Sequence, residues 1–268
     1  MSRTAVVLLA VVAHWPAWWW AGRTAEHTGD LGLHGLAAAT FAALVFRALR
    51  RPASGAAVDL RAPAVGLALS SVLGLAIGGL AGALSAVAAT VWIVSRLATE
   101  RRFHLGLFGL GLLALPLLPI FELQLGPALR LPAAQGAATL LRTAGFHVEA
   151  MGTVLSHPGG EVWVDPPCAG IAMLWTALFV GLAAGTIRGW SNARLAFTAG
   201  LATAAVLLGN AWRVAALFVL ETSPWPRPAW LHGATGLAIE ALVLAAVLLL
   251  GAPRRERGGA PCVVVAHS

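Results

Sequence analysis

Long apolar runs, separated by short polar or glycine-rich segments, dominate the chain. A membrane-crossing helix needs about 20 apolar residues, and the pattern predicts eight such spans. We expect them at 4–22, 31–49, 62–78, 81–98, 104–121, 168–187, 194–220 and 230–251. The third and fourth are predicted as a hairpin turning near Gly78, Gly79 and Gly82, because a single helix there would be roughly 55 Å long in a hydrocarbon core of about 30 Å.

The composition supports this membrane interpretation. Hydrophobic residues make up 59% of the chain, charged residues only 11%, and the mean hydropathy is +0.81, which lies outside the range of soluble globular domains. We therefore predict an all-α integral membrane protein with a single polytopic domain over residues 1–251. The tail 252–268 mixes Gly, Pro and Arg and is expected to be disordered. The first span resembles a signal peptide, but we interpret it as an uncleaved helix.

The arginines predict the orientation in the membrane. All 18 basic residues are arginine, and cytoplasmic loops are enriched in arginine and lysine. If the N-terminus is cytoplasmic, thirteen arginines fall on the cytoplasmic side and four on the outer side, while Arg213 lies within a span. Both termini are therefore predicted to be cytoplasmic. The net charge of +7 is explained by topology, so a nucleic-acid partner is not expected.

One long segment, at about 122–167, is then expected on the outer side. Its first half, Pro132–Gly145, has a helical pattern and is predicted to lie on the membrane surface. Its second half predicts a β-hairpin, with strands over 147–156 and 161–165 joined by a turn at 157–160. His157 in that turn is interpreted as a turn residue, because His-Pro-Gly-Gly is typical turn chemistry.

Three reactive or charged side chains are predicted to meet at the outer face. Cys168 stands at the outer start of the sixth span, after Pro166 and Pro167, where a helix N-terminus would lower the pKa of its thiol. Arg213 lies about 12 Å below the outer end of the seventh span, and His232 stands near the outer start of the eighth.

Each of these residues also has an ordinary structural interpretation. A membrane cysteine is often a small apolar filler, and a histidine at the interface can be an anchor. Arg213 is different, because a buried arginine costs at least about 2.5 kcal/mol and is by default functional or paired. We hypothesise that it pairs with Glu240 in the eighth span, at a comparable depth. Asn210 is expected on the same helical face as Arg213 and is a supporting candidate.

Several protease classes are excluded by missing residues. The chain has no lysine and no tyrosine, so a serine–lysine dyad and a Schiff base are impossible. It has no G-x-S-x-G and no H-E-x-x-H motif, and its three aspartates fall in predicted loops. No cofactor and no metal ion is expected. Cys262 is expected to be a free cytoplasmic thiol without an assigned role.

Three stretches carry a family resemblance. "DPPCAGIAMLW" from Asp165, "GNAWRVAALFVLE" from Gly209 and "LHGATG" from Leu231 resemble the signature regions of the exosortase and archaeosortase family, which are prokaryotic polytopic membrane cysteine transpeptidases. The resemblance covers roughly residues 115–251. It implies that Cys168 is the nucleophile, Arg213 the conserved arginine and His232 the third catalytic residue, with histidine as in the exosortase branch.

The resemblance also implies a function and a location. The expected substrates are exported proteins that end in a short motif, one transmembrane helix and a basic tail, processed at the outer face of the prokaryotic inner membrane and transferred to an acceptor. The alternative is a non-proteolytic membrane component of a polysaccharide assembly or transport system, in which Arg213, Glu240 and His232 line a polar path. A transporter should tolerate Cys168→Ser, whereas a cysteine transpeptidase should lose nearly all turnover.

Overall fold

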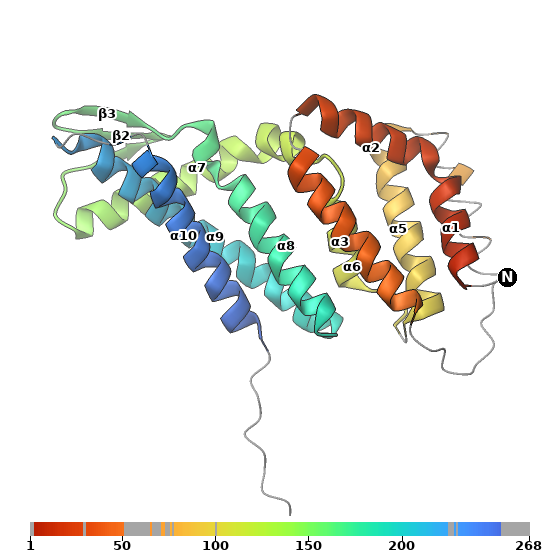
Figure 1. Ribbon diagram of the computed structural model, residues 1–268. Helices are drawn as coiled ribbons and strands as arrows, with labels where there is room; N and C mark the ends of the chain where they lie inside the picture. The colour runs from red at the N-terminus through yellow and green to blue at the C-terminus, as the bar shows by residue number, and fades with distance from the viewer. Residues whose placement is uncertain are drawn as a thin grey trace, which may run out of the picture.

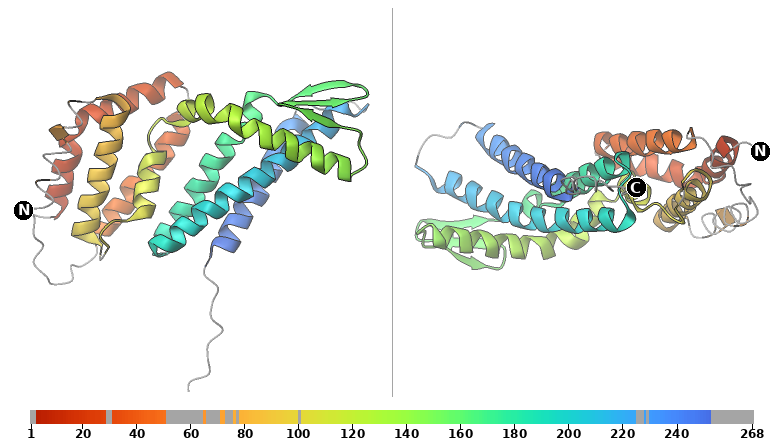
Figure 2. Two further views of the ribbon diagram at one scale, coloured as in Figure 1. Left: turned by 180° about the vertical axis from the view of Figure 1, so that it is seen from behind. Right: turned by 90° about the horizontal axis from the view of Figure 1, so that it is seen from below.

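The computed structural model describes residues 3–28, 31–50, 65, 71–72, 76, 78–99, 101–224, 228 and 230–252. Its helices stand in a row, and most of them run between the upper and lower ends of the molecule in Figure 1. Helices α2 and α7 instead lie across the upper part, and a small sheet packs beside α7 (Figures 1 and 2). The helices are α1 Arg3–Ala13, α2 Trp15–Thr28, α3 Leu31–Leu49, α5 Gly79–Ala98, α6 Leu105–Leu113, α7 Leu118–Thr143, α8 Ile171–Ile187, α9 Asn192–Thr222 and α10 Trp230–Gly251.

The described helices support a polytopic membrane protein. Helices α3, α5, α9 and α10 are long and apolar enough to cross a membrane, and the number rises to six if two bent pairs each count as one span. The predicted spans at 31–49, 81–98, 194–220 and 230–251 agree closely with these four helices. Helix α8 matches the sixth predicted span but begins at Ile171. Most of the predicted span at 62–78 and the whole tail after 252 lie outside the described residues.

Two predicted spans are broken by bends. The span predicted at 4–22 is divided at His14 into α1 and α2, which meet at 63°. The span predicted at 104–121 is also interrupted. Helix α6 ends at Leu113, and α7, which begins at Leu118, is bent by 94° from the direction of α6. Pro116 lies in this break, where its missing N–H and its ring oppose a continuous helix. Hydropathy alone missed both bends because the apolar pattern continues through them.

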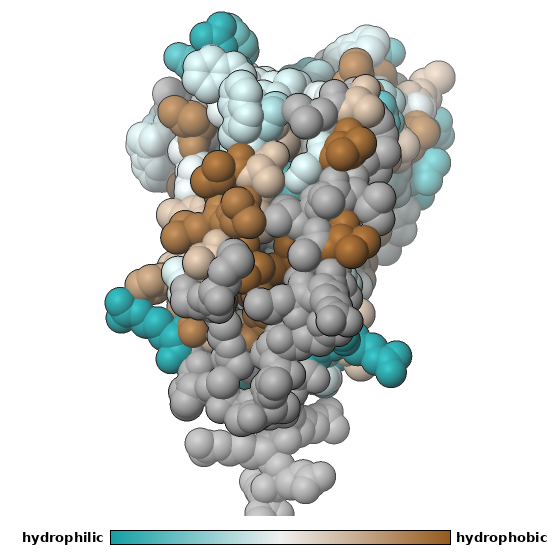
Figure 3. All heavy atoms as spheres, turned by 90° about the vertical axis from the view of Figure 1, so that its right-hand side faces the viewer, coloured by the Kyte–Doolittle hydropathy of each residue, from teal (hydrophilic) through white to brown (hydrophobic). Residues whose placement is uncertain are grey.

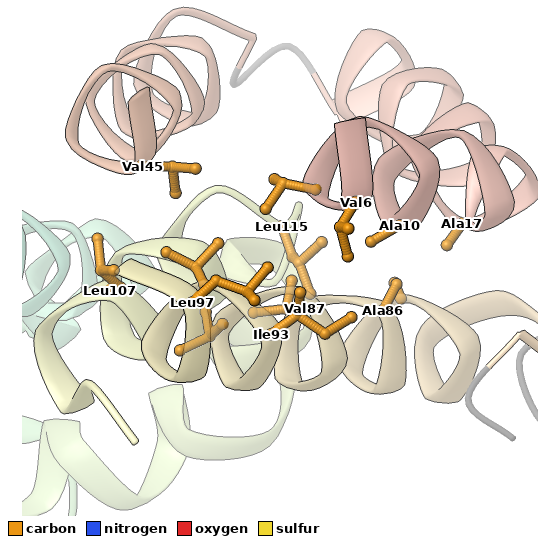
Figure 4. Close-up of a cluster of buried hydrophobic side chains, with 14 residues drawn as sticks. Val6, Ala10, Ala17, Val45, Ala86, Val87, Ile93, Leu97, Leu107 and Leu115 are labelled. Atoms are coloured by element: carbon orange, nitrogen blue, oxygen red, sulfur yellow. The ribbon is translucent and has the colours of Figure 1, made fainter. Parts of the chain in front are cut away.

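The N-terminal helices share one apolar core. Val6 and Ala10 of α1 and Ala17 of α2 face Ala86, Val87, Ile93 and Leu97 of α5, with Val45, Leu107 and Leu115 alongside (Figure 4). Branched aliphatic side chains fill most of this core, and alanines such as Ala10, Ala17 and Ala86 lie among them. Brown apolar side chains occupy the middle of the end face in Figure 3, with hydrophilic side chains above and below them.

The C-terminal helices and the sheet form the part of the fold that positions the site. Helix α9 packs against α7, α8 and α10. Helix α7 contacts it through a row of alanines that includes Ala133, Ala134, Ala137 and Ala138. The predicted surface helix is therefore longer than expected, and one of its faces is buried against α9.

The segment that the sequence analysis predicted to be outer contains three strands where two were predicted. Strands β1 (Glu149–Met151), β2 (Val154–His157) and β3 (Gly160–Trp163) pair antiparallel in that order. The predicted first strand is divided by a turn at Gly152, whose φ of +65° favours glycine. The turn between β2 and β3 follows the prediction, because the N–H of Gly159 donates to His157 Nδ1 at 3.2 Å. Leu155 is fully buried and anchors the sheet in the α7–α9 core.

Arginine side chains bond to backbone carbonyls at and beyond the ends of α10 and α8. Arg194 at the start of α9 donates to the carbonyls of Gly251 at 2.7 Å, Leu250 at 3.3 Å and Ala252, which satisfies the free C-terminal end of α10. Arg101 donates in the same way to Gly189 O after α8, at 3.0 Å. The sequence analysis used these arginines only to predict the orientation in the membrane. In the structure they also donate hydrogen bonds to carbonyls at the end of α10 and after α8.

Candidate active site

Cys168 lies in a short 3-10 turn ahead of α8. The turn covers Pro166–Ala169, and the N–H of Cys168 donates to Asp165 O at 2.8 Å. Gly170 then takes a left-handed conformation, with φ +79° and ψ +11°, and α8 begins at Ile171. The predicted proline-led helix start is thus a separate turn, and Cys168 does not stand in the first turn of α8.

Asn210 of α9 forms a hydrogen bond with the backbone of this turn. Its Nδ2 donates to the carbonyl of Cys168 at 2.8 Å, and the Asn210 side chain is buried. Gly170 is required at this point, because a Cβ there would lie 2.9 Å from Asn210 Cγ. Asn210 was predicted as a supporting residue of the site. The contact that the structure shows is with the backbone of the candidate nucleophile.

The pKa of the Cys168 thiol differs from the expectation. Burial raises it above the usual value, the Arg213 guanidinium opposes this by lowering it, and the carboxylates of Asp165 and Glu221 raise it further. The predicted lowering by a helix N-terminus is therefore wrong, since the helix begins only after Gly170. A raised pKa favours the neutral thiol, which needs a base before it can act as a nucleophile.

Cys168, Arg213 and His232 line one small hollow, as the sequence predicted. The hollow has a volume of about 100 Å³ and is bounded by β3, the 3-10 turn, α9 and α10. Cys168 is half-buried, whereas His232 is exposed. No hydrogen bond joins Cys168 to His232, both of which belong to the described residues; a candidate base often reaches hydrogen-bond distance only in the substrate complex.

A second, larger cavity adjoins this hollow and shares Pro167, Arg213 and His232 with it. Its volume is about 410 Å³. Its walls are formed by α7, the 3-10 turn, the first residues of α8, Arg213 of α9, and α10 between His232 and Glu240. Glu240 lines its deeper part but does not form the predicted ion pair with Arg213, although both residues are described. Its carboxylate instead accepts a hydrogen bond from Thr176 Oγ1 of α8 at 2.6 Å. The Nε of Arg213 is buried without a partner.

Three contributors to the site were missed by sequence reasoning. Glu221 lines the hollow with Cys168, Arg130 of α7 lines the larger cavity, and Gly170 sets the turn. Arg130 had been counted only as an outer arginine, because nothing in the local pattern shows that α7 packs against α9. Glu221 lies eight residues after Arg213 on α9 and hence on nearly the same helical face, which is a signal that could have identified it.

The fold and the site define a class of protein: a polytopic helical membrane protein with a half-buried cysteine, an arginine and a histidine around one hollow. A family model described as "transmembrane exosortase" matches residues 4–251. The chain therefore belongs to the transmembrane exosortase family, and this membership supports a membrane transpeptidase role in general. Comparisons with curated proteins and with solved structures gave no match.

Proposed function

We propose that this protein is a membrane-embedded cysteine transpeptidase that cleaves the C-terminal sorting signal of exported proteins at the outer face of the inner membrane. The observation that carries the proposal is the common hollow of Cys168, Arg213 and His232, which are supplied by three separate elements. Membership of the transmembrane exosortase family supports a transpeptidase role in general. Cys168 is the nucleophile, His232 the base and Arg213 the oxyanion-stabilising cation.

The first half of the reaction follows from these roles. His232 accepts the proton of the Cys168 thiol as the sulfur attacks the carbonyl carbon of the scissile peptide bond. The negative charge that develops on the carbonyl oxygen is stabilised by Arg213, whose buried Nε–H has no acceptor among the described residues. The intermediate collapses to a thioester when the C–N bond breaks, and the imidazolium of His232 gives its proton to the departing amine.

The second half transfers the exported protein. An acceptor nucleophile attacks the thioester and gives its proton to His232, which passes it to the departing sulfur and so restores the Cys168 thiol. Because the hollow is small and half enclosed, transfer is favoured over hydrolysis by bulk water. A reconstituted reaction that yields only hydrolysed product would argue against the transfer step.

The decisive experiment replaces the native protein by a Cys168→Ala variant. We expect exported proteins with intact C-terminal helices to accumulate, as measured by mass spectrometry of their C-terminal peptides. Cys262→Ala is the matched control, because it removes the only other cysteine of the chain, and processing should continue.

The same strains distinguish the alternative of a transport or assembly component. Such a component needs no thiol, so Cys168→Ser would leave its activity intact. Normal C-terminal processing in the folded Cys168→Ala and Cys168→Ser variants would refute the transpeptidase proposal.

A further inference from the structure

Strand β3 forms an edge of the small sheet that no helix covers. The strand order is β1-β2-β3. Helix α7 packs against β1 and β2, and no helix among the described elements makes a comparable contact with β3. A strand at the edge of a sheet carries a row of unpaired N–H and C=O groups, which are a template for a further strand.

The register of the sheet identifies the backbone groups at this free edge. Opposite residues of an antiparallel pair alternate between hydrogen-bonded and non-hydrogen-bonded positions. The N–H of Val164 donates to Thr153 O at 2.9 Å, so Val164 and, two residues earlier, Val162 bond to β2. Trp163 and Glu161 take the alternate positions of the same pair. Their N–H and C=O groups therefore point away from β2, to the free edge.

The hollow that holds Cys168 lies along the same edge. Val162, Trp163 and Val164 all line it, although successive side chains of a strand point to opposite faces of a sheet. What three successive residues share is the edge of the strand, and no residue of β2, all of which is described, lines the hollow. The free edge of β3 therefore opens on the hollow.

The strand also leads toward the candidate nucleophile. Asp165 follows β3 after Val164, and the 3-10 turn that carries Cys168 begins at Pro166, as can be followed from β3 to the start of α8 in Figure 1. Under the proposed function, the substrate chain comes from the exported domain, passes Cys168 and continues to its own membrane helix. A substrate segment that follows the free edge to Cys168 therefore runs in the same direction as β3.

We propose that the substrate segment ahead of the scissile bond binds as a fourth strand of the sheet, parallel to β3, through the N–H and C=O groups of Glu161 and Trp163. This inference rests on the proposed transpeptidase function. Strand addition holds a polypeptide extended and takes its affinity from main-chain hydrogen bonds. The ring of Trp163, which is 65% exposed, adds an apolar surface beside the edge. The pairing presents the scissile carbonyl to Cys168 in one orientation.

The first test measures hydrogen exchange of backbone amides in the full-length Cys168→Ala variant in lipid nanodiscs. The probe is a synthetic peptide that spans the cleavage site and the membrane helix of a protein that accumulates in the Cys168→Ala strain. With saturating peptide, the amides of Glu161 and Trp163 should exchange more slowly by about 10-fold or more, because a hydrogen-bonded amide exchanges only when its bond opens.

The opposite edge of the sheet provides the matched control. Ala150 of β1 lies opposite Leu155, and the backbone groups of Leu155 point toward Val162 of β3. The N–H of Ala150 therefore also points out of the sheet, but at the edge away from the hollow, which Ala150 does not line. Its exchange rate should not change when the peptide binds.

Proline substitutions test the same groups by activity in the enzyme that keeps Cys168. Proline lacks an N–H, so Glu161→Pro removes an outward donor and leaves the bonds to β2 in place. Glu161→Ala removes the same side chain but keeps the donor. We expect kcat/KM of Glu161→Pro to be about 3- to 10-fold below that of Glu161→Ala, as for one backbone hydrogen bond. Ala150→Pro should leave kcat/KM unchanged, and melting temperatures verify that each variant is folded.

Three results would overturn the proposal. The amides of Glu161 and Trp163 could exchange at the same rate with and without bound peptide, or folded Glu161→Pro could be as active as Glu161→Ala. Slow exchange at these amides could also appear without peptide and increase with enzyme concentration, which would identify a second copy of the chain as the pairing strand. The exchange measurement needs no thiol, so these results are separate from normal processing by Cys168→Ala, which would refute the transpeptidase function itself.

Discussion

Replacing Gly170 by alanine should displace Cys168 without altering any reactive side chain. Gly170 has φ +79°, where a side chain costs about 1–2 kcal/mol. The new Cβ would also lie 2.9 Å from Cγ and 3.0 Å from Nδ2 of Asn210. Contacts below 3.0 Å force a shift, and a shifted Asn210 loses its 2.8 Å bond to the Cys168 carbonyl, which is worth about 1 kcal/mol. The total is roughly 2–3 kcal/mol.

The chain provides a matched control for this substitution. Gly189, beyond the other end of α8, has φ +73° and nothing within 4 Å of its would-be Cβ, so Gly189→Ala carries the backbone cost alone. The assays are the melting temperature and the iodoacetamide alkylation rate of Cys168 in a Cys262→Ala background. We expect both variants to lose stability, but only Gly170→Ala to change the alkylation rate and to lose turnover. Equal alkylation rates and equal turnover in the two variants would refute the role of the Asn210 contact.

Three further predictions concern the thiol, a helix end and the core. The alkylation rate of Cys168 should rise with pH along a titration whose midpoint lies above that of a free cysteine, because burial raises the pKa; Arg213→Gln should move the midpoint still higher, and a lower midpoint would contradict the assigned charge effect. Arg194→Gln removes the bonds to three carbonyls at the end of α10. It should lower the free energy of unfolding by about 1–3 kcal/mol and hence the melting temperature. Substitution of an exposed arginine, Arg102→Gln, should leave the melting temperature unchanged. Leu155→Ala removes a fully buried side chain and should cost about 2–5 kcal/mol in denaturant unfolding; a cost below 1 kcal/mol would show that the sheet is not anchored in the α7–α9 core.

Much of the fold and part of the site could be predicted from the sequence. Apolar length alone located α3, α9 and α10, since a helix in lipid must satisfy its own backbone bonds and needs a defined length. Helix connectivity then brought Cys168, Arg213 and His232 to one end of the molecule.

The remaining details depend on contacts that no local pattern contains. The bend after Leu113 was missed because Leu115 and Leu117 continue the apolar run around Pro116. The pairing of Arg213 with Glu240 failed because depth along a helix does not fix the direction of a side chain, and Thr176 of α8 is the group that reaches the carboxylate. The pKa of Cys168 was misjudged because burial of the thiol depends on the packing of α9 and β3.

Among the described residues, those that line the two hollows at the site all lie from Glu122 onward. The helices before α7 contribute no lining side chain among those described, and they are connected to the site by packing, with α3 and α6 against α8 and α6 also against α9. These helices therefore influence the candidate site through the positions of α8 and α9. Substitutions in these helices that keep α8 and α9 in place should therefore leave the lining of both hollows unchanged.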